Sequence, residues 1–259
     1  MSIYIYTSEG LAIQTVTLSL FRFASLPTQL WALAQMGLLR PAVSRVPGIG
    51  FWKLCGAGTG EGFTPLPDRR VMGILATWPD LPTAERATAE AAPFRRLGRR
   101  AAESWTVFLS PVASRGRWSG TAPFQPGAQD THDAPLAVLT RATLHWRHLL
   151  GFWSHAPMIS RAIGAHPDVL FKIGIGEVPW LQQVTFSIWP DAPGMTDFAR
   201  GDGPHRRAIA AVRAGDWFRE ELYARFHVLG TRGTWPGAGR VPRLGRPDLP
   251  QPTPSKDPC

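Results

Sequence analysis

The chain has 259 residues, of which 44% are hydrophobic and 18% charged. This composition supports a substantial folded core and excludes a disordered protein. With two cysteines, Cys55 and Cys259, the sequence excludes a disulfide framework, a cysteine-rich zinc site and a four-cysteine iron–sulfur cluster.

The formal net charge of +9 is carried almost entirely by arginine. These arginines are spread through amphipathic segments instead of forming one basic block, so we expect no nucleic-acid partner. Attraction to an anionic membrane surface is the better interpretation. The longest apolar runs, such as Met72 to Trp78, are far shorter than the roughly 20 residues of a membrane-spanning helix, and residues 1–13 lack the pattern of a signal peptide. We therefore expect a cytoplasmic protein.

The first half of the chain predicts a strand over Gln14 to Phe23 and a helix around Leu30, Trp31 and Leu33. Two strands joined by turn residues follow, one at Lys53 and one over Val71 to Trp78. Phe94, Leu97, Ala101 and Trp105 have the spacing of one helical face, and Thr106 to Leu109 predicts a last strand.

The second half repeats this order. It predicts a strand over Leu136 to Thr143, a helix around Leu149, Phe152 and Trp153, strands at Lys172 and over Val184 to Trp189, a second helix and a strand over Arg225 to Leu229. The shared landmarks in the first half are Phe51–Leu54, Leu75–Asp80, Pro93–Arg96 and Arg115–Trp118; those in the second half are Leu170–Ile173, Phe186–Asp191, Pro204–Arg207 and Arg232–Trp235. Their agreement in order and spacing indicates an internal duplication.

The order β-α-β-β-α-β is ferredoxin-like, with two helices on one face of a four-stranded antiparallel sheet. Two such sheets can bury their open faces against each other. We therefore predict an α+β protein in which duplicated ferredoxin-like repeats form a dimeric-α/β-barrel-like structure within one chain, with a cavity or a core between the sheets. The expected organisation is an N-terminal extension over 1–13, a first repeat over 14–118, a linker over 119–135, a second repeat over 136–235 and a proline-rich disordered tail over 236–259.

His205 is the most informative chemical difference between the halves, because it stands where the first half has Phe94. His205, Ile209 and Val212 share one helical face, so the imidazole is expected to face an apolar interior. The positive end of the helix disfavours imidazolium there, and a neutral imidazole at an apolar wall suits a haem iron. A histidine that faces solvent or makes one hydrogen bond in the core is the alternative.

The other histidines and Cys55 have structural interpretations as well. His145 and His148 are three residues apart but lack the carboxylate context of common metal sites. His155, His166 and His227 can be surface or core-edge residues. Cys55 can supply a thiolate to haem, but a small buried cysteine is commoner.

The glycine-rich stretch Cys55 to Gly62 links two strands, so it predicts a hairpin or bulge instead of a phosphate-binding loop. Lys53, Lys172, Glu61 and Glu177 are expected to pair across the hairpins. Alternatively, Lys172 or Arg141 can provide the fixed cation for haem propionates. Most of the tryptophans are expected in the core, whereas Trp31 and Trp153 can line an apolar groove or sit at a lipid interface.

Four long segments resemble the spheroidene monooxygenase family of acyclic carotenoid 2-ketolases. They are Gln14–Phe23, Pro47–Gly56, Gly58–Pro65 and Phe171–Glu177, and the resemblance extends from about Gln14 to Trp235. It implies a haem-containing oxygenase that uses O2 and reduced ferredoxin to introduce a hydroxyl and then a ketone at C-2 of spheroidene-type carotenoids.

The resemblance also implies an enzyme that associates peripherally with the photosynthetic membrane, where its carotenoid substrate is held. Haem would carry the oxygen chemistry, with His205 as the candidate iron ligand. The alternatives are a non-catalytic haem- or lipid-binding barrel and a haem-degrading or peroxide enzyme of similar fold.

Overall fold

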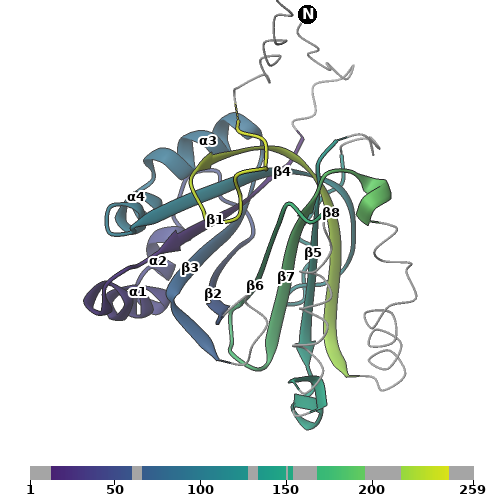
Figure 1. Ribbon diagram of the computed structural model, residues 1–259, viewed down its shortest axis with the longest axis horizontal. Helices are drawn as coiled ribbons and strands as arrows, with labels where there is room; N and C mark the ends of the chain where they lie inside the picture. The colour runs from purple at the N-terminus through teal and green to yellow at the C-terminus, as the bar shows by residue number, and fades with distance from the viewer. Residues whose placement is uncertain are drawn as a thin grey trace, which may run out of the picture.

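The computed structural model describes residues 13–59, 66–127, 134–149, 151–153, 168–195 and 217–244. Within these ranges eight strands form one closed barrel, in the neighbour order β1-β3-β2-β6-β7-β5-β8-β4, and all neighbours pair antiparallel. Helices of the first half of the chain lie on the outside of the barrel (Figure 1). The predicted α+β class is confirmed, as an eight-stranded antiparallel barrel.

The first half contributes β1 (Thr15–Arg22), α1 (Leu26–Leu38), α2 (Arg40–Val43), β2 (Trp52–Gly58), β3 (Pro67–Trp78), α3 (Leu81–Glu90), α4 (Ala92–Gly98) and β4 (Glu103–Gly116). The second half contributes β5 (Leu136–Leu144), the 3-10 turn η1 (Trp146–His148), β6 (Phe171–Gly176), β7 (Gln182–Trp189) and β8 (Phe218–Gly233). Each strand predicted from the sequence is present, most of them longer than expected.

The two halves use the same relative strand order. In the first half the order is β4-β1-β3-β2, and in the second half it is β8-β5-β7-β6. This order agrees with the predicted duplication. Most of the residues expected to form the helices of the second half, His205 among them, lie outside the described ranges, so the complete ferredoxin-like repeat stays a prediction.

Two seams join the halves, and they differ in length. Strands β4 and β8 pair from Trp105 opposite Gly233 to Gly116 opposite Leu222, whereas β2 and β6 share two paired positions. Gly116 and Gly233 have φ angles of 93° and 87°, and a Cβ on either would approach a backbone oxygen of the opposing strand to 2.2 or 2.1 Å. Glycine is therefore required at both ends of the long seam.

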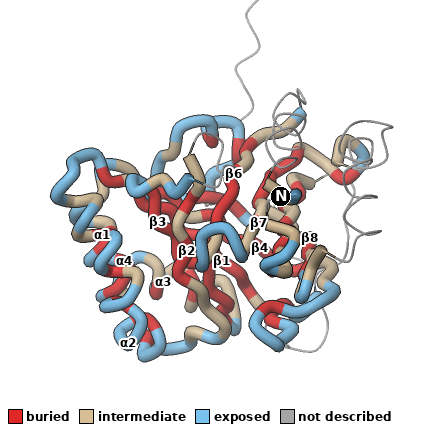
Figure 2. The backbone as a smooth tube through the Cα atoms, turned by 90° about the horizontal axis from the view of Figure 1, so that it is seen from below, coloured by how far each residue is buried: buried red, intermediate tan, exposed pale blue. Residues whose placement is uncertain are grey.

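Alternation of side chains along the strands produces two apolar layers. The barrel interior is filled by side chains from all eight strands and by Phe124 of the segment after β4. It contains the ring pairs Trp105–Phe171 and Phe124–Phe226, with centroids 4.7 and 5.0 Å apart. A second layer lies between α1–α4 and the outer face of β1–β4 (Figure 2). Over the described residues, the space between the two sheets is a packed core.

Trp105 is not on a helix, contrary to the expectation. Helix α4 ends at Gly98, and Trp105 lies in β4, where it pairs with Leu20 of β1 and points into the barrel. Phe94 and Leu97 do form the buried face of α4. The helical spacing continued past the true helix end because strand pairing, which is non-local, overrides local periodicity.

The segments expected to be linker and tail also contribute to the core. Phe124, in the predicted linker, is buried in the barrel interior, in the core that also contains Trp118 at the end of the predicted first repeat. Beyond Trp235, Ala238 and Val241 are buried in the same core, and the Arg240 guanidinium donates to the Val169 carbonyl over 2.8 Å. The prediction of a disordered tail is therefore wrong for residues 236–244: apolar side chains among the prolines and glycines cover the end of the barrel. Residues 245–259 lie outside the described ranges.

Among the helices that the structure describes, none combines the length and the apolar character needed to cross a lipid bilayer.

Truncation after Trp235 tests whether residues 236–244 stabilise the fold. A chain that ends at Trp235 loses Ala238 and Val241 from the barrel core and the partly buried Leu244 from the outer apolar layer. It should lose roughly 2–5 kcal/mol of unfolding free energy. A chain that ends at Leu244 keeps these contacts and serves as the control. Urea denaturation of both chains checks the prediction, and equal midpoints would contradict it.

Candidate functional site

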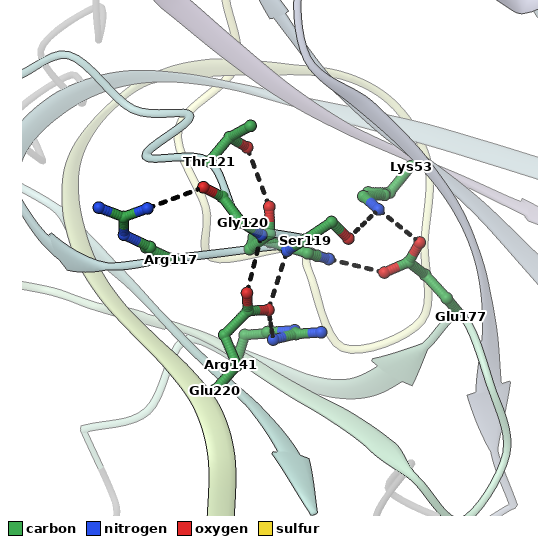
Figure 3. A network of polar contacts seen from close by, with 9 residues as sticks. Lys53, Arg117, Ser119, Gly120, Thr121, Arg141, Glu177 and Glu220 are labelled. Carbon is green, nitrogen blue, oxygen red and sulfur yellow. Dashed lines mark hydrogen bonds and ion pairs between the residues drawn. The ribbon is translucent and has the colours of Figure 1, made fainter.

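Charged side chains meet inside one end of the barrel, where β4, β5 and β6 end and β2 and β8 begin (Figure 3). Lys53 Nζ forms an ion pair with Glu177 over 2.8 Å and donates to Ser119 Oγ over 2.7 Å. Trp118 Nε1 donates to the same Glu177 carboxylate over 2.6 Å. The predicted pairing of Lys53 with a hairpin glutamate therefore occurs, but across the junction of the two halves; Glu61 lies outside the described ranges.

Arg141 is the most deeply buried cation of this network. Its side chain is 1% exposed, forms an ion pair with Glu220 and lies over the Trp118 ring at 5.6 Å. Glu220 also accepts hydrogen bonds of 2.8 Å from the backbone N–H groups of Ser119 and Gly120. Arg141, predicted as a cofactor-binding cation, thus points into the barrel and already contacts a carboxylate.

The surroundings of Arg141 and Glu220 shift the pKa values of both side chains. Burial lowers the pKa of Arg141 from its ordinary value, although the Glu220 charge opposes this shift. Burial alone would raise the pKa of Glu220, but the hydrogen bonds from Gly120 and Ser119 and the Arg141 charge outweigh it and hold this pKa below its ordinary value. Two cations balanced by two carboxylates make a stabilising network that holds the post-β4 turn against β5, β6 and β8.

Lys172 lies on the other face of the barrel wall. Phe171, Ile173 and Ile175 of β6 point into the core, so Lys172, between the first two, points outward. The sequence landmarks of the two halves matched Lys53 with Lys172, but strand pairing matches Trp52 with Lys172. Trp52 pairs with Ala76, which pairs with Thr17 on the next strand; Lys172 pairs with Ser187, which pairs with Val138 in the same way. A slip of one residue reverses the face of every side chain, and this corrects the alignment.

The outer faces of the two half-barrels differ at corresponding positions. In the first half, Leu54 and Ile74 fill the layer beneath the helices. The matched positions in the second half are Gly174 and Thr185. The outer face of the second half-sheet therefore carries smaller side chains than the first at these two positions.

Two cations flank this stretch of smaller side chains, which we call the outer cradle: Gly174, Thr185, Ser187 and Thr140. Lys172 and Arg225 lie at the two ends of one cross-strand row, with Ser187 and Val138 between them. The matched first-half positions are the aromatic residues Trp52 and Phe108. Sequence analysis missed Arg225 and the cradle because the signal, loss of large apolar residues, becomes visible only when the register is known.

The other candidates are placed as follows. His205, His155 and His166 lie outside the described ranges. Cys55 is buried in the barrel interior, where burial raises the pKa of its thiol and disfavours the thiolate that would bind a metal. His148 stacks on Trp217, with ring centroids 5.8 Å apart. His227 lies on the outer face of β8, opposite Leu136 of β5.

No group of three or more metal-binding side chains from His, Cys, Asp and Glu occurs among the residues that the structure describes.

Comparison of the whole sequence with curated proteins reveals close relatives. The chain is 50% identical to spheroidene monooxygenase of Cereibacter sphaeroides over 246 residues, which cover 93% of this chain and 76% of the relative. It is 47% identical to spheroidene monooxygenase of Rhodobacter capsulatus, over 85% of this chain and 92% of that protein. The chain belongs to the spheroidene monooxygenase family. No protein-family model matches it.

The fold is shared with solved structures of different sequence. An aldoxime dehydratase superimposes with a TM-score of 0.61 at 12% identity, covering 93% of this chain and 91% of that one. A second, in complex with butyraldoxime, gives a TM-score of 0.58 at 11% identity, covering 85% and 81%. At this identity the likeness concerns the barrel fold, which the family therefore shares with these enzymes.

The Arg141–Glu220 pair should stabilise the barrel in a pH-dependent way. Glu220→Gln leaves the buried guanidinium without its countercharge and should cost roughly 2–4 kcal/mol at pH 7. Because the pKa of Glu220 is lowered on folding, its stabilisation is present above its unfolded pKa and is lost as the pH falls through its folded pKa.

Urea denaturation of wild type and Glu220→Gln between pH 7 and pH 3 tests this prediction, and the difference between them should shrink towards low pH. Glu103→Gln is the control, because Glu103 pairs with Arg22 where both side chains are about a third exposed. The control should lose at most about 1 kcal/mol. Equal losses in the two variants would contradict the prediction.

Proposed function

We propose that the chain is a haem-dependent carotenoid monooxygenase that introduces a 2-keto group into spheroidene-type acyclic carotenoids with O2 and reduced ferredoxin. The observation that carries this proposal is membership of the spheroidene monooxygenase family, at 50% identity over nearly the whole chain. Haem, ferredoxin and peripheral association with a membrane are parts of the proposal, as is the duplicated ferredoxin-like repeat.

The outer cradle is our proposed site for the haem. A flat macrocycle needs a surface with short side chains, and Gly174, Thr185 and Ser187 provide these on adjacent strands β6 and β7. Its propionates need cations, and Lys172 and Arg225 lie at the edges of the same face. We assign the cation role to Lys172 with Arg225 in preference to Arg141, because Arg141 lies on the opposite face of the barrel wall, inside the barrel.

The match between Phe94 and His205 supports the same location. Phe94 is buried between α4 and the outer face of the first half-sheet, 6.1 Å from the Trp78 ring centroid to centroid. If the duplication extends to the matched helix, His205 faces the outer side of the second half-sheet. His205 is therefore our proposed iron ligand, beside the cradle and outside the barrel interior.

Haem, when bound, would supply the activation of O2 that carbon–hydrogen oxidation requires. In the first proposed turnover a C-2 methylene, O2, two electrons and two protons give a C-2 alcohol and water. In a second turnover the C-2 alcohol, O2, two electrons and two protons give a geminal diol and water. The diol then loses water to form the ketone. Ferredoxin is the proposed electron source for both turnovers.

The protein would bind and orient the cofactor and the carotenoid, and would shield them from water. The cradle on β6 and β7 would hold the macrocycle, and Lys172 and Arg225 would bind its propionates. The packed core beneath the cradle, including Phe186 and Ile188 on the inner side of β7, keeps water from that side of the wall. The apolar carotenoid would bind above the cofactor, with C-2 next to the reactive face.

The iron ligand is tested by absorption spectra of purified protein, taken oxidised, reduced and reduced with carbon monoxide. Wild type should show a stoichiometric Soret band that shifts with carbon monoxide, and His205→Ala should lose the bound haem and the ketolase activity while circular dichroism remains unchanged. His145→Ala is the matched control and should keep both. Full haem occupancy with an unchanged Soret band in His205→Ala would overturn the assignment.

The cradle is tested by restoring the large side chain of the first half. Gly174→Leu gives β6 a leucine at the position that matches Leu54 of β2. The larger side chain should occupy the proposed haem site and reduce haem occupancy at least about tenfold. Gly56→Leu is the control, since a Cβ at Gly56 meets no atom within 4 Å. Haem titration followed at the Soret band measures occupancy, and an equal affinity in both variants would refute the location.

The proposed enzyme and the alternative functions differ in the product that forms during turnover. Oxygenation of spheroidene with O2 and a ferredoxin-reducing system, followed by chromatography of the 2-oxygenated products, separates the proposed enzyme from a non-catalytic haem- or lipid-binding barrel. Loss of the Soret band during turnover without carotenoid product would indicate a haem-degrading enzyme instead.

A further inference from the structure

Helix α1 exposes its apolar residues and buries a polar one. Leu26, Leu30, Leu33 and Leu38 are 55%, 52%, 57% and 70% exposed, whereas Gln35 is 1% exposed. No residue of this 13-residue helix is charged. The helix is held to the barrel by a narrow contact at Ala32, Gln35 and the half-buried Trp31 and Met36.

The exposed leucines form one surface, the leucine face, which consists of Leu26, Leu30, Leu33 and Leu38. The first three are separated by four and then three residues, so they lie along one side of the helix. Exposed Gly37, Pro41 and Ala42 continue the surface into α2. Single exposed leucines are ordinary in soluble proteins, but a contiguous helical face of them marks an interaction surface.

Helix α4 lies next to α1 (Figure 2), and arginines of α4 and of the residues directly after it border the leucine face. Arg100 and Arg96 lie over the Trp31 ring of α1, at 4.3 and 5.8 Å from its centroid. With Arg95 and Arg99 they line a surface hollow of about 490 Å³, together with Glu90 and Ala92. We call these four the arginine rim. All four are exposed, and none forms an ion pair within the described part of the chain.

We propose that the leucine face and the arginine rim dock this protein on a membrane that contains anionic phospholipids. The leucines enter the boundary between headgroups and acyl chains, and the rim binds the lipid phosphates in its hollow. An uncharged apolar helix face with cations beside it is the pattern of a helix lying in the interfacial plane. This inference deepens the proposed function and rests on it in one respect: a spheroidene-type substrate is dissolved in the bilayer.

Charge favours a lipid surface over a second copy of the chain. Two copies joined through the leucine face in a two-fold arrangement would bring two arginine rims together, with one acidic residue, Glu90, in each hollow. An acidic protein would satisfy the arginines, but it would have to cover a flat aliphatic face that lacks the polar groups typical of transient protein interfaces. Anionic phospholipids supply both the phosphates and the hydrocarbon.

The experiment is sedimentation of the full chain with vesicles of phosphatidylcholine alone and of phosphatidylcholine with 30% phosphatidylglycerol, a composition of about one anionic lipid in three. We expect binding to the anionic vesicles that weakens with salt, and at least about tenfold weaker binding to phosphatidylcholine. Leu30→Gln with Leu33→Gln, and separately Arg95→Gln with Arg99→Gln, should each weaken binding to anionic vesicles about tenfold or more.

Two controls remove the same groups elsewhere on the surface. Leu66→Gln changes an exposed leucine of the β2–β3 region, and Arg69→Gln with Arg243→Gln removes two exposed arginines outside the helices. Both should bind like wild type, and all variants should keep the wild-type unfolding midpoint. Controls that lose as much as the test variants would overturn the assignment, as would wild type that fails to bind anionic vesicles.

Light scattering and turnover separate the remaining outcomes. A wild-type dimer that becomes monomeric in Leu30→Gln with Leu33→Gln, without vesicle binding, would identify the face as a self-association surface and refute the proposal. Detergent-dispersed carotenoid should be oxidised equally by wild type and the leucine variant, whereas vesicle-held carotenoid should be oxidised about tenfold more slowly by the variant. Vesicle binding without any carotenoid oxidation by wild type would refute the proposed function and leave the docking surface intact.

Discussion

Closure of the barrel by the β4–β8 seam is the constraint on which the rest of the structure depends. Once β4 and β8 are paired along eleven positions and β2 meets β6, the side that each residue faces is determined by alternation. The seam needs Gly116 and Gly233 at its ends, because any side chain there would collide with the opposing backbone. The turn after Gly116 then carries Trp118 and Ser119 to the charged network, where Lys53 and Arg141 each find a carboxylate.

The halves share a strand order but use their outer faces differently. In the first half, large apolar side chains on β2, β3 and β4 pack beneath four helices. In the second half, the matched positions Gly174, Thr185, Lys172 and Arg225 hold small, polar or cationic residues. The packed interior between the sheets separates these two outer layers, so changes on one face need not disturb the other.

This separation suits a protein of the spheroidene monooxygenase family whose proposed substrate is a membrane carotenoid. The first half supplies a rigid helical layer, and the outward leucines of α1 cost the fold little because Ala32 and Gln35 make the contact with the sheet. The second half supplies the proposed cofactor face.

The sequence by itself determined the strands, the matched order of the two halves and the α+β class, because strong apolar alternation and repeated landmarks are local signals. It also determined the family, through long segments that require no register. Tertiary structure decided what depends on pairing between distant residues. It moved Trp105 from a helix to β4, brought Ala238 and Val241 into the core, and placed Lys172 and Arg141 on opposite faces. A register shift of one residue reverses a strand's faces, and only the hydrogen-bonded neighbours of that strand fix its register.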